Sequence, residues 1–381
     1  MFVMPDKKIL YVKFQDTDTL WENGRHLFAI LNAFSLANYQ IYLCDSVIQL
    51  LQNIFGSNLD DFPLPARLAL RLNNVVIVKS PPIGVEAGIY IFDIEDKYLR
   101  GRKWAKKIQL KFDLFSSYRF SKPMIMPYAV HPAHATEDFS QRAKALRATP
   151  RKVRALFAGD SKGYRRKWIH YPGTKLSRLN VLETIRTRMA GDTISINDIS
   201  VLEAIFNNYF TQKCVIVDSE ARIEWDQWLI TISFADFFLC PPGIVMPMCH
   251  NVIEAMSVGT IPIINYAEWL SPNLRHLENC IVFHDENDLI EKIGFVLKMD
   301  SDQISAIKEN VVHYFETYLN PVTFVQRLER SDESMITVLM YSERNVAKNS
   351  SKLNSKSIVI RGEEAAGEWA LAKKYLPIFQ H

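Results

Sequence analysis

The sequence predicts an α/β protein built from two Rossmann-like domains. Three segments carry this prediction, because each has the apolar pattern of a strand that leads into a loop and a helix. Residues 8–14 alternate as a strand does, and the pattern of residues 25–38 is helical. Residues 153–159 are typical of a buried strand that ends in glycine, and residues 234–240 form an apolar run long enough for another.

Composition places the chain among ordinary globular proteins. Its 381 residues are enough for two or three domains with buried cores. Hydrophobic residues make up 48% and charged residues 23% of the chain, and the formal net charge is only +3. That charge does not indicate nucleic-acid binding, so no nucleic-acid partner is expected. Since no apolar run reaches ~18 residues, no transmembrane segment is expected either.

The five cysteines do not suggest a metal centre. They lie at positions 44, 214, 240, 249 and 280, without a C-x-x-C pair or a nearby histidine cluster. Reduced thiols are the expected state, with no zinc site. Asp16 and Asp18 have the spacing of a D-x-D motif, but a catalytic metal needs further ligands, so no metal site is expected.

The most informative stretch is residues 234–265. The strand at 234–240 is stopped by Pro241, Pro242 and Gly243, because proline cannot donate to a sheet and glycine permits a sharp turn. Asn251 is interpreted as the N-cap of a helix that ends at Gly259, before a second buried strand at 260–265.

Glu254 is the unusual residue of that helix, because its neighbours are apolar. One interpretation is a charge that stabilises the start of the helix through the helix dipole. The other is a carboxylate at the carboxyl end of a parallel sheet, where it could bind both hydroxyls of a ribose. The backbone N–H groups at the start of the helix would then suit a diphosphate.

The segment F-F-L-C-P-P-G, followed by I-E-A-M-S-V-G-T-I-P-I-I, resembles the nucleotide-binding half of GT-B glycosyltransferases, most closely the exostosin-type family. The resemblance covers residues 225–270 closely. It implies two Rossmann-like domains facing across a cleft: an acceptor domain at 1–140, a nucleotide-sugar domain at 141–360, and a helix at 361–381 that crosses back to the first. The implied activity is metal-independent transfer of a sugar from a nucleotide-diphosphate sugar to a glycan hydroxyl, without a cofactor.

The resemblance also implies a set of donor-binding residues. Glu254 would bind the ribose, and backbone groups from Gly243 to Asn251 would face the diphosphate. The chain departs from the family pattern where an arginine often precedes the helix glutamate, since His250 and Asn251 stand there. We therefore expect phosphate contacts from the loop after Gly159, which is basic; a solvated basic surface is the alternative. The residues of that loop are Lys162, Arg165 and Arg166.

Acceptor-side candidates collect after the first strand. Asp16, Asp18, Glu22 and His26 could bind sugar hydroxyls, and one of them could act as a base; Asp93 is a further candidate. The alternatives are an ordinary polar loop and a structural histidine. A mechanism that retains the anomeric configuration would need no such base.

Two other functional classes stay open. A GT-B-fold sugar-nucleotide epimerase would need no acceptor, and a catalytically silent module would only bind a sugar or nucleotide. Enzymes of the lumen in this family usually carry an N-terminal anchor. Since residues 1–9 do not resemble a signal peptide, we expect either a cytoplasmic protein or a chain from which an anchor has been removed.

Several outer segments have weaker patterns. Helices are expected at 289–297, 303–318 and 363–379. The basic stretch 97–111 is interpreted as a solvated helix face, and residues 342–357 as a mobile loop, because they are rich in serine, asparagine and lysine.

Overall fold

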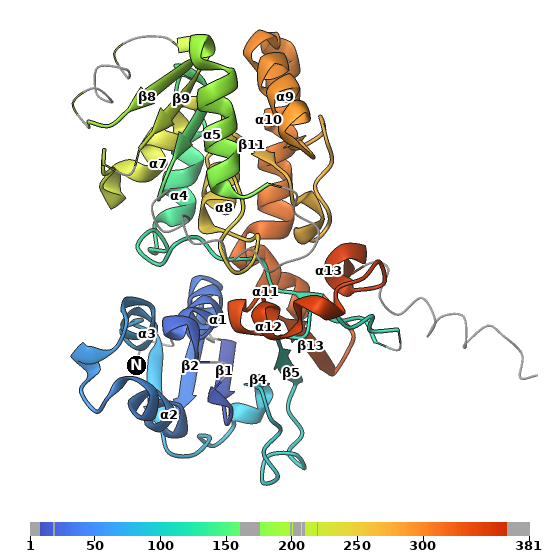
Figure 1. The fold of residues 1–381 in the computed structure, drawn as a ribbon. Helices are drawn as coiled ribbons and strands as arrows, with labels where there is room; N and C mark the ends of the chain where they lie inside the picture. Colours follow the sequence, from blue (N-terminus) through green and yellow to red (C-terminus); the bar gives the residue numbers. More distant parts are fainter. Residues whose placement is uncertain are drawn as a thin grey trace, which may run out of the picture. The chain divides into compact units, whose positions relative to one another are not determined.

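The computed structural model describes residues 8–17, 20–119, 121–160, 176–198, 200, 207, 210–218 and 220–363. The chain divides into two compact units. The first unit comprises Met1–Pro132, Asn320–Asn345 and Lys356–His381, and the second comprises Ala133–Leu319 and Val346–Ser355. Each unit contains one sheet (Figure 1).

The sheet of the first unit has seven parallel strands in the order β3-β2-β1-β4-β5-β13-β6. Leu10 of β1 lies opposite Ile41 of β2 and Ile89 of β4, and all three are buried. Helices cover this sheet, and all four residues of its central strand β4 are apolar and buried. The strands are β1 (Lys8–Lys13), β2 (Tyr39–Cys44), β3 (Val75–Val78), β4 (Ile89–Phe92), β5 (Lys106–Lys111), β6 (Met124–Ile125) and β13 (Met335–Leu339).

Helix α1 of the first unit buries the apolar stripe that its sequence predicts, including Leu27, Leu31 and Phe34. It begins directly after Gly24, whose φ of +77° is left-handed. A Cβ at Gly24 would lie 2.7 Å from the Cβ of Ala66, so the entry to α1 packs tightly on α3. The helices of this unit are α1 (Arg25–Leu36), α2 (Asp45–Phe55), α3 (Leu64–Leu70), α11 (Pro321–Arg330) and α13 (Ile358–Arg361), and α12 (Glu343–Asn349) passes into the second unit.

The sheet of the second unit has six parallel strands in the order β12-β11-β10-β7-β9-β8. Strands β8 and β9 lie on one side of β7, and β10, β11 and β12 lie on the other. The connections therefore change direction between β7 and β10, and open α/β sheets bind ligands outside such a point. The strands are β7 (Val153–Ala158), β8 (Thr193–Ile196), β9 (Phe210–Val217), β10 (Ala235–Leu239), β11 (Ile261–Ile264) and β12 (Ile281–Val282).

Three of the described helices of the second unit begin at a side-chain cap. The side chains of Ser177, Asp285 and Asp300 accept hydrogen bonds from backbone N–H groups in the first turns of α5, α9 and α10. The helices are α4 (Phe139–Leu146), α5 (Arg178–Arg188), α7 (Trp225–Ser233), α8 (His250–Ser257), α9 (Glu286–Lys298) and α10 (Ser301–Tyr314), the last continuing into a π-helical turn at Phe315–Leu319.

The structure corrects two interpretations of outer segments. The basic stretch 97–111 is not a helix face, because Lys106–Lys111 forms β5 with Ile108 and Leu110 buried on one side. The period of two in K-I-Q-L-K is the signal for this strand. The segment 342–357 contains α12 and a 3₁₀ turn, and Val346 is buried in α12.

The fold class is confirmed: the chain is α/β with two Rossmann-like domains, which is the domain composition of the GT-B fold. The unit limits differ from the expected ranges 1–140 and 141–360, because the segment Asn320–Asn345 returns to the first unit. Its strand β13 lies beside β5 in Figure 1, as the parallel pairing requires. The expected crossing helix at 361–381 falls almost wholly outside the described residues. None of the described helices is long and apolar enough to cross a membrane.

Candidate functional site at the carboxyl edges of the two sheets

The carboxyl ends of β7 and β10 meet where the second sheet changes direction. Gly159 follows β7 with a φ of +135°, which a residue with a side chain rarely adopts. After β10, Cys240 is fully buried and the chain turns at the two prolines before Gly243. The sequence placed both glycines in the donor site, and the structure places both at this edge.

Gly243 is required by a close approach of the backbone. A Cβ at this position would lie 2.4 Å from the carbonyl oxygen of Met246 and 3.2 Å from Sγ of Cys249. The N–H of Gly243 donates to the carbonyl of Pro247 at 3.1 Å. The loop thus folds back on itself and brings the start of α8 to the end of β10.

Helix α8 begins at His250, and Cys249 is its N-cap residue. The predicted N-cap, Asn251, is wrong by two positions, because the extended backbone conformation lies at Cys249. Glu254 is consequently the fifth helical residue and lies beyond the first turn. This removes the basis for interpreting Glu254 as a charge on the helix dipole, which acts within the first turn. His250 is half-buried and Asn251 is buried.

Glu254 is buried, with 2% of its surface exposed. The indole Nε1 of Trp228, on α7, donates to Oε2 of Glu254 at 2.6 Å. The Trp228 ring in turn meets Phe238 of β10 edge to face, with the ring centroids 6.2 Å apart. A buried carboxylate is costly unless hydrogen bonds stabilise it, and Trp228 supplies one. Sequence reasoning missed Trp228, which lies 26 positions before Glu254.

Arg178 connects the end of β7 to the start of α8, and sequence reasoning missed it as well. It is the first residue of α5 and is 4% exposed. Its Nη1 donates to the carbonyl of Asp160, just after β7, at 2.9 Å. Its Nη2 lies 3.5 Å from Sγ of Cys249, at the start of α8. The structure therefore holds a buried cation at the switch point, where a diphosphate would need one.

Other predicted phosphate ligands lie outside the described residues. Lys162, Arg165 and Arg166 belong to residues 161–175.

Asn265, which the sequence did not single out, follows β11 at the same edge and donates from Nδ2 to the carbonyl of Leu176 at 3.0 Å. Its Oδ1 is buried and accepts no hydrogen bond from the described residues.

In the first unit, Asp16 lies at the carboxyl end of β1, as expected, whereas Asp18 lies outside the described residues. The backbone N–H groups of Gln15 and Asp16 donate to the carboxylate of Asp93 at 2.9 and 2.8 Å. Asp93, the further candidate base, therefore organises the loop after β1.

Glu22 and His26 lie together, as their roles would require, but both are tied to the segment after β13, with His26 buried and Glu22 half-buried. Oε1 of Glu22 accepts from Oγ of Ser342 at 2.8 Å and from the N–H of Arg344 at 3.3 Å. Nε2 of His26 is 3.0 Å from the carbonyl of Tyr341 and 3.5 Å from Oε2 of Glu22. Glu22 also has a left-handed φ of 59°. A residue with a side chain keeps such a strained backbone conformation only where the contacts around it enforce it, and such residues are common at ligand sites.

Two further charged groups complete this cluster. Nη1 of Arg25 lies 3.8 Å from Oε1 of Glu343, which is the first residue of α12. Burial and the nearby charge of Glu22 raise the pKa of Glu343, although Arg25 opposes them. Two carboxylates, an imidazole and a guanidinium therefore gather at the carboxyl edge of the first sheet, where they could bind hydroxyl groups. Across the parts of the chain that the structure describes, no three His, Cys, Asp or Glu side chains are arranged to hold a metal ion.

No known sequence family matches this chain, and no curated protein does. Solved structures with a similar order of elements include Anabaena HepE in complex with UDP and glucose, at 10% identity and a TM-score of 0.36, over 85% of this chain and 98% of that one. An α-glucosyltransferase in complex with UDP and a 13-mer DNA has 12% identity and a TM-score of 0.40, over 85% and 99%. The lipopolysaccharide glycosyltransferase WaaG has 12% identity and a TM-score of 0.35, over 85% and 100%. At these values the likenesses assign a role to no residue of the site.

Proposed function

We propose that the protein is a glycosyltransferase that moves a sugar from a nucleotide-diphosphate sugar to a hydroxyl of a glycan. The observation that carries the proposal is the pairing of a buried cation and a buried carboxylate at one switch point. Arg178 lies between the end of β7 and the start of α8, and Glu254 lies within α8. A nucleotide-diphosphate sugar has the two matching groups, a diphosphate and a ribose diol.

In the proposed donor site, some groups neutralise the charge of the diphosphate and others orient the ribose. The Arg178 guanidinium and the N–H groups at the starts of α5 and α8 would neutralise the leaving diphosphate as its charge develops. Glu254 would accept from the ribose hydroxyls, and Trp228 would hold its carboxylate in one orientation. Since Glu254 is 2% exposed, the residues that cover it have to move aside when the donor binds.

The proposed acceptor site belongs to the first unit, at the carboxyl ends of β1 and β13. Asp16, Glu22, His26 and Glu343 offer carboxylate and imidazole acceptors for sugar hydroxyls there. Deprotonation of the attacking hydroxyl by one of them would be worth ~10²–10⁴ in rate. The cation at the donor site takes the place of a metal in this proposal, so transfer is expected without a divalent ion.

A thermal-shift screen of the full chain against UDP, ADP, GDP and their sugars tests the donor site. A ligand present at ~100 times its Kd should raise the free energy of unfolding by about 2.7 kcal/mol. Stabilisation by a nucleoside diphosphate in the wild type, lost in Glu254→Ala, supports the proposal, whereas no response to any of them contradicts it.

Product analysis then identifies the reaction. A transferase should form product only when a glycan acceptor is present and should keep its activity in EDTA. Conversion of the donor alone into its epimer would indicate an epimerase, and binding without turnover a silent module. Loss of activity in EDTA that Mn²⁺ restores would contradict metal independence.

A further inference from the structure

A cavity of about 460 Å³ lies in the first unit, in the segment that connects β5 to β6. Its volume is within the ~300–1,000 Å³ range of small-molecule sites. Apolar atoms form much of the lining, which also includes two cationic side chains and several hydroxyl groups. The residues that matter here are Lys111, Asp113, Ser117, Tyr118, Arg119 and Ser121.

The cavity lies at the edge of the sheet that holds the proposed acceptor site. Lys111 is the last residue of β5, and its carbonyl accepts from the N–H of Met340, just after β13. The next residue, Phe112, packs against His26 with the ring centroids 4.8 Å apart. Phe112 itself does not line the cavity, so it lies between Lys111 and Asp113 of the lining in sequence and contacts the cluster of Glu22 and His26.

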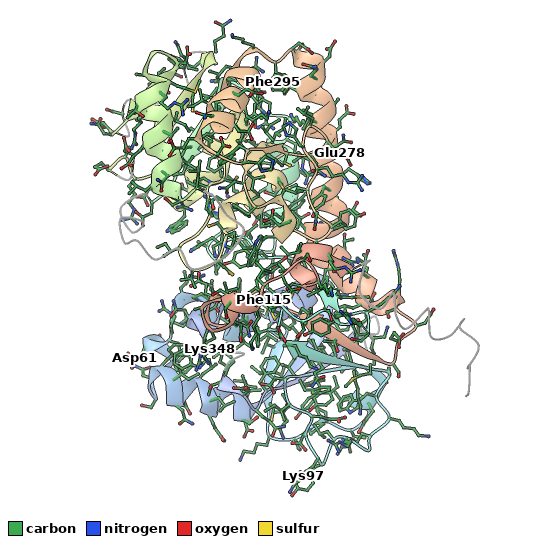
Figure 2. The ribbon with its side chains drawn as sticks, turned by 45° about the vertical axis from the view of Figure 1, so that its right-hand side comes forward. Asp61, Lys97, Phe115, Glu278, Phe295 and Lys348 are labelled. Atoms are coloured by element: carbon green, nitrogen blue, oxygen red, sulfur yellow. The ribbon has the colours of Figure 1, made fainter. Side chains whose placement is uncertain are left out.

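The walls of the cavity are held in place by hydrogen bonds within the connection. Oδ1 of Asp113 accepts from the N–H groups of Phe115 and Ser116 at 3.1 and 3.2 Å. The hydroxyl of Tyr118 donates to the carbonyl of Asp113 at 2.9 Å, although Tyr118 has a left-handed φ of 46°. Phe115, labelled in Figure 2, is buried. A site prepared in this way loses little entropy when a ligand binds.

Among the described lining residues, two cations stand against one carboxylate, so the charge of the cavity is positive. Lys111 and Arg119 are exposed, and neither side chain has a hydrogen bond or ion pair with any described residue. Asp113, the one carboxylate among the described lining residues, accepts hydrogen bonds from backbone N–H groups and from the hydroxyl of Ser116. Two cations beside serine hydroxyls form a receptor for an anion with several oxygens.

We propose that this cavity binds a phosphate monoester, and that the acceptor of the reaction carries that group on a sugar. Two cations match a charge near −2, and the Arg119 fork can bond two phosphate oxygens at once. The remaining volume accommodates the sugar ring next to the phosphate. The acceptor role rests on the proposed function, whereas binding of the phosphate monoester does not.

Calorimetric titration of the full chain with glucose 6-phosphate, glucuronate and glucose tests the site. Glucose 6-phosphate should bind, and added salt should weaken its binding because the two cations are exposed. Arg119→Gln and Lys111→Gln should each reduce the affinity at least about tenfold, as expected for a charged hydrogen bond. Lys122→Gln removes a charge from the same connection outside the cavity lining and should change the affinity less than threefold.

Each contrary result has a definite meaning. Equal binding of glucuronate would overturn the phosphate assignment, and unchanged binding in both Arg119→Gln and Lys111→Gln would overturn the site itself. Loss of glucose 6-phosphate binding in Arg178→Gln alone would place the phosphate at the donor site and also overturn it. UDP titrations on the same variants keep the two proposals separate, because Arg119→Gln should leave nucleotide affinity unchanged. Binding of glucose 6-phosphate without binding of any nucleotide would refute the proposed function and leave the cavity assignment standing.

Discussion

The indole Nε1 of Trp228 donates a 2.6 Å hydrogen bond to Oε2 of Glu254. This contact joins α7 to α8 and holds a carboxylate whose residue is 2% exposed. It orients the carboxylate that we propose binds the ribose.

Replacing Trp228 by phenylalanine should lower the free energy of unfolding by about 1–3 kcal/mol, because the buried carboxylate loses a donor. Donor binding should weaken as well, because the carboxylate is no longer oriented. Trp225→Phe makes the same chemical change on α7 at a residue that is 49% exposed, and it should cost less. Urea denaturation measures the first effect and calorimetry with UDP-sugars the second. Equal stability of the two variants would contradict the role of Trp228.

Arg178→Lys should weaken nucleoside diphosphate binding at least tenfold, because an ammonium group cannot reach the Asp160 carbonyl and Cys249 together. Arg188→Lys is the matched control, since Arg188 ends the same helix and is exposed. Titration of both variants with UDP, ADP and GDP measures the difference. Wild-type affinity in Arg178→Lys would show that the guanidinium fork does not bind the diphosphate.

Gly243→Ala should destabilise the protein by about 1–3 kcal/mol and abolish nucleotide binding, because the added Cβ would lie 2.4 Å from the Met246 carbonyl. The loop would have to open and move the start of α8. Gly191→Ala adds the same methyl group where no heavy atom lies within 4 Å, and it should be neutral. Thermal unfolding with and without nucleotide compares the two, and identical behaviour would argue against a tight loop.

Asp16→Asn should leave donor binding unchanged, because Asp16 lies after β1 in the first unit and the proposed donor residues belong to the second. Glu22→Gln and His26→Gln should reduce stability too, since both side chains fasten the segment after β13. If one of the three is the base, its variant should lose ~10²–10⁴ in transfer rate while keeping donor affinity. Wild-type transfer by all three variants would leave Asp18 and Asp93, or a mechanism without a base.

The ion pair of Lys13 with Asp96 should make the free energy of unfolding depend on pH in the acidic range. Burial alone would raise the pKa of Asp96, but the hydrogen bond from Lys13 and those from backbone N–H groups outweigh it and lower the pKa. Because the pKa of Asp96 is lower in the folded state than in the unfolded state, where it is about 3.9, the ionised carboxylate stabilises the fold above that pH. This stabilisation is lost as the pH falls through the pKa of the folded state. Asp96→Asn should therefore cost about 1–2 kcal/mol at pH 7 and progressively less below pH 4. Asp60→Asn, which breaks an exposed pair with Arg71, should cost little at any pH. Denaturation midpoints between pH 2 and 7 measure both.

The sequence by itself determined the local elements. The apolar runs at 8–14, 153–159 and 234–240 became β1, β7 and β10, and the stripe in 25–38 became α1. Proline and glycine at 241–243 correctly marked the end of a strand, because their backbone restrictions are local. The placement of Gly159, Gly243 and Glu254 at one sheet edge followed from parallel-sheet topology and from the family resemblance.

Tertiary structure alone decided which distant groups meet. His26 contacts the Tyr341 carbonyl across 315 positions, and Arg178 reaches Cys249 across 71. Strand β13 follows the whole second sheet in the chain, yet it pairs with β5 of the first sheet. An apolar run predicts that a strand is buried, but it does not predict which strand it pairs with. The N-cap at Cys249 rather than Asn251 likewise belongs to the loop that folds back at Gly243. Periodicity and turn chemistry act over a few residues, whereas these contacts depend on how strands are ordered in space.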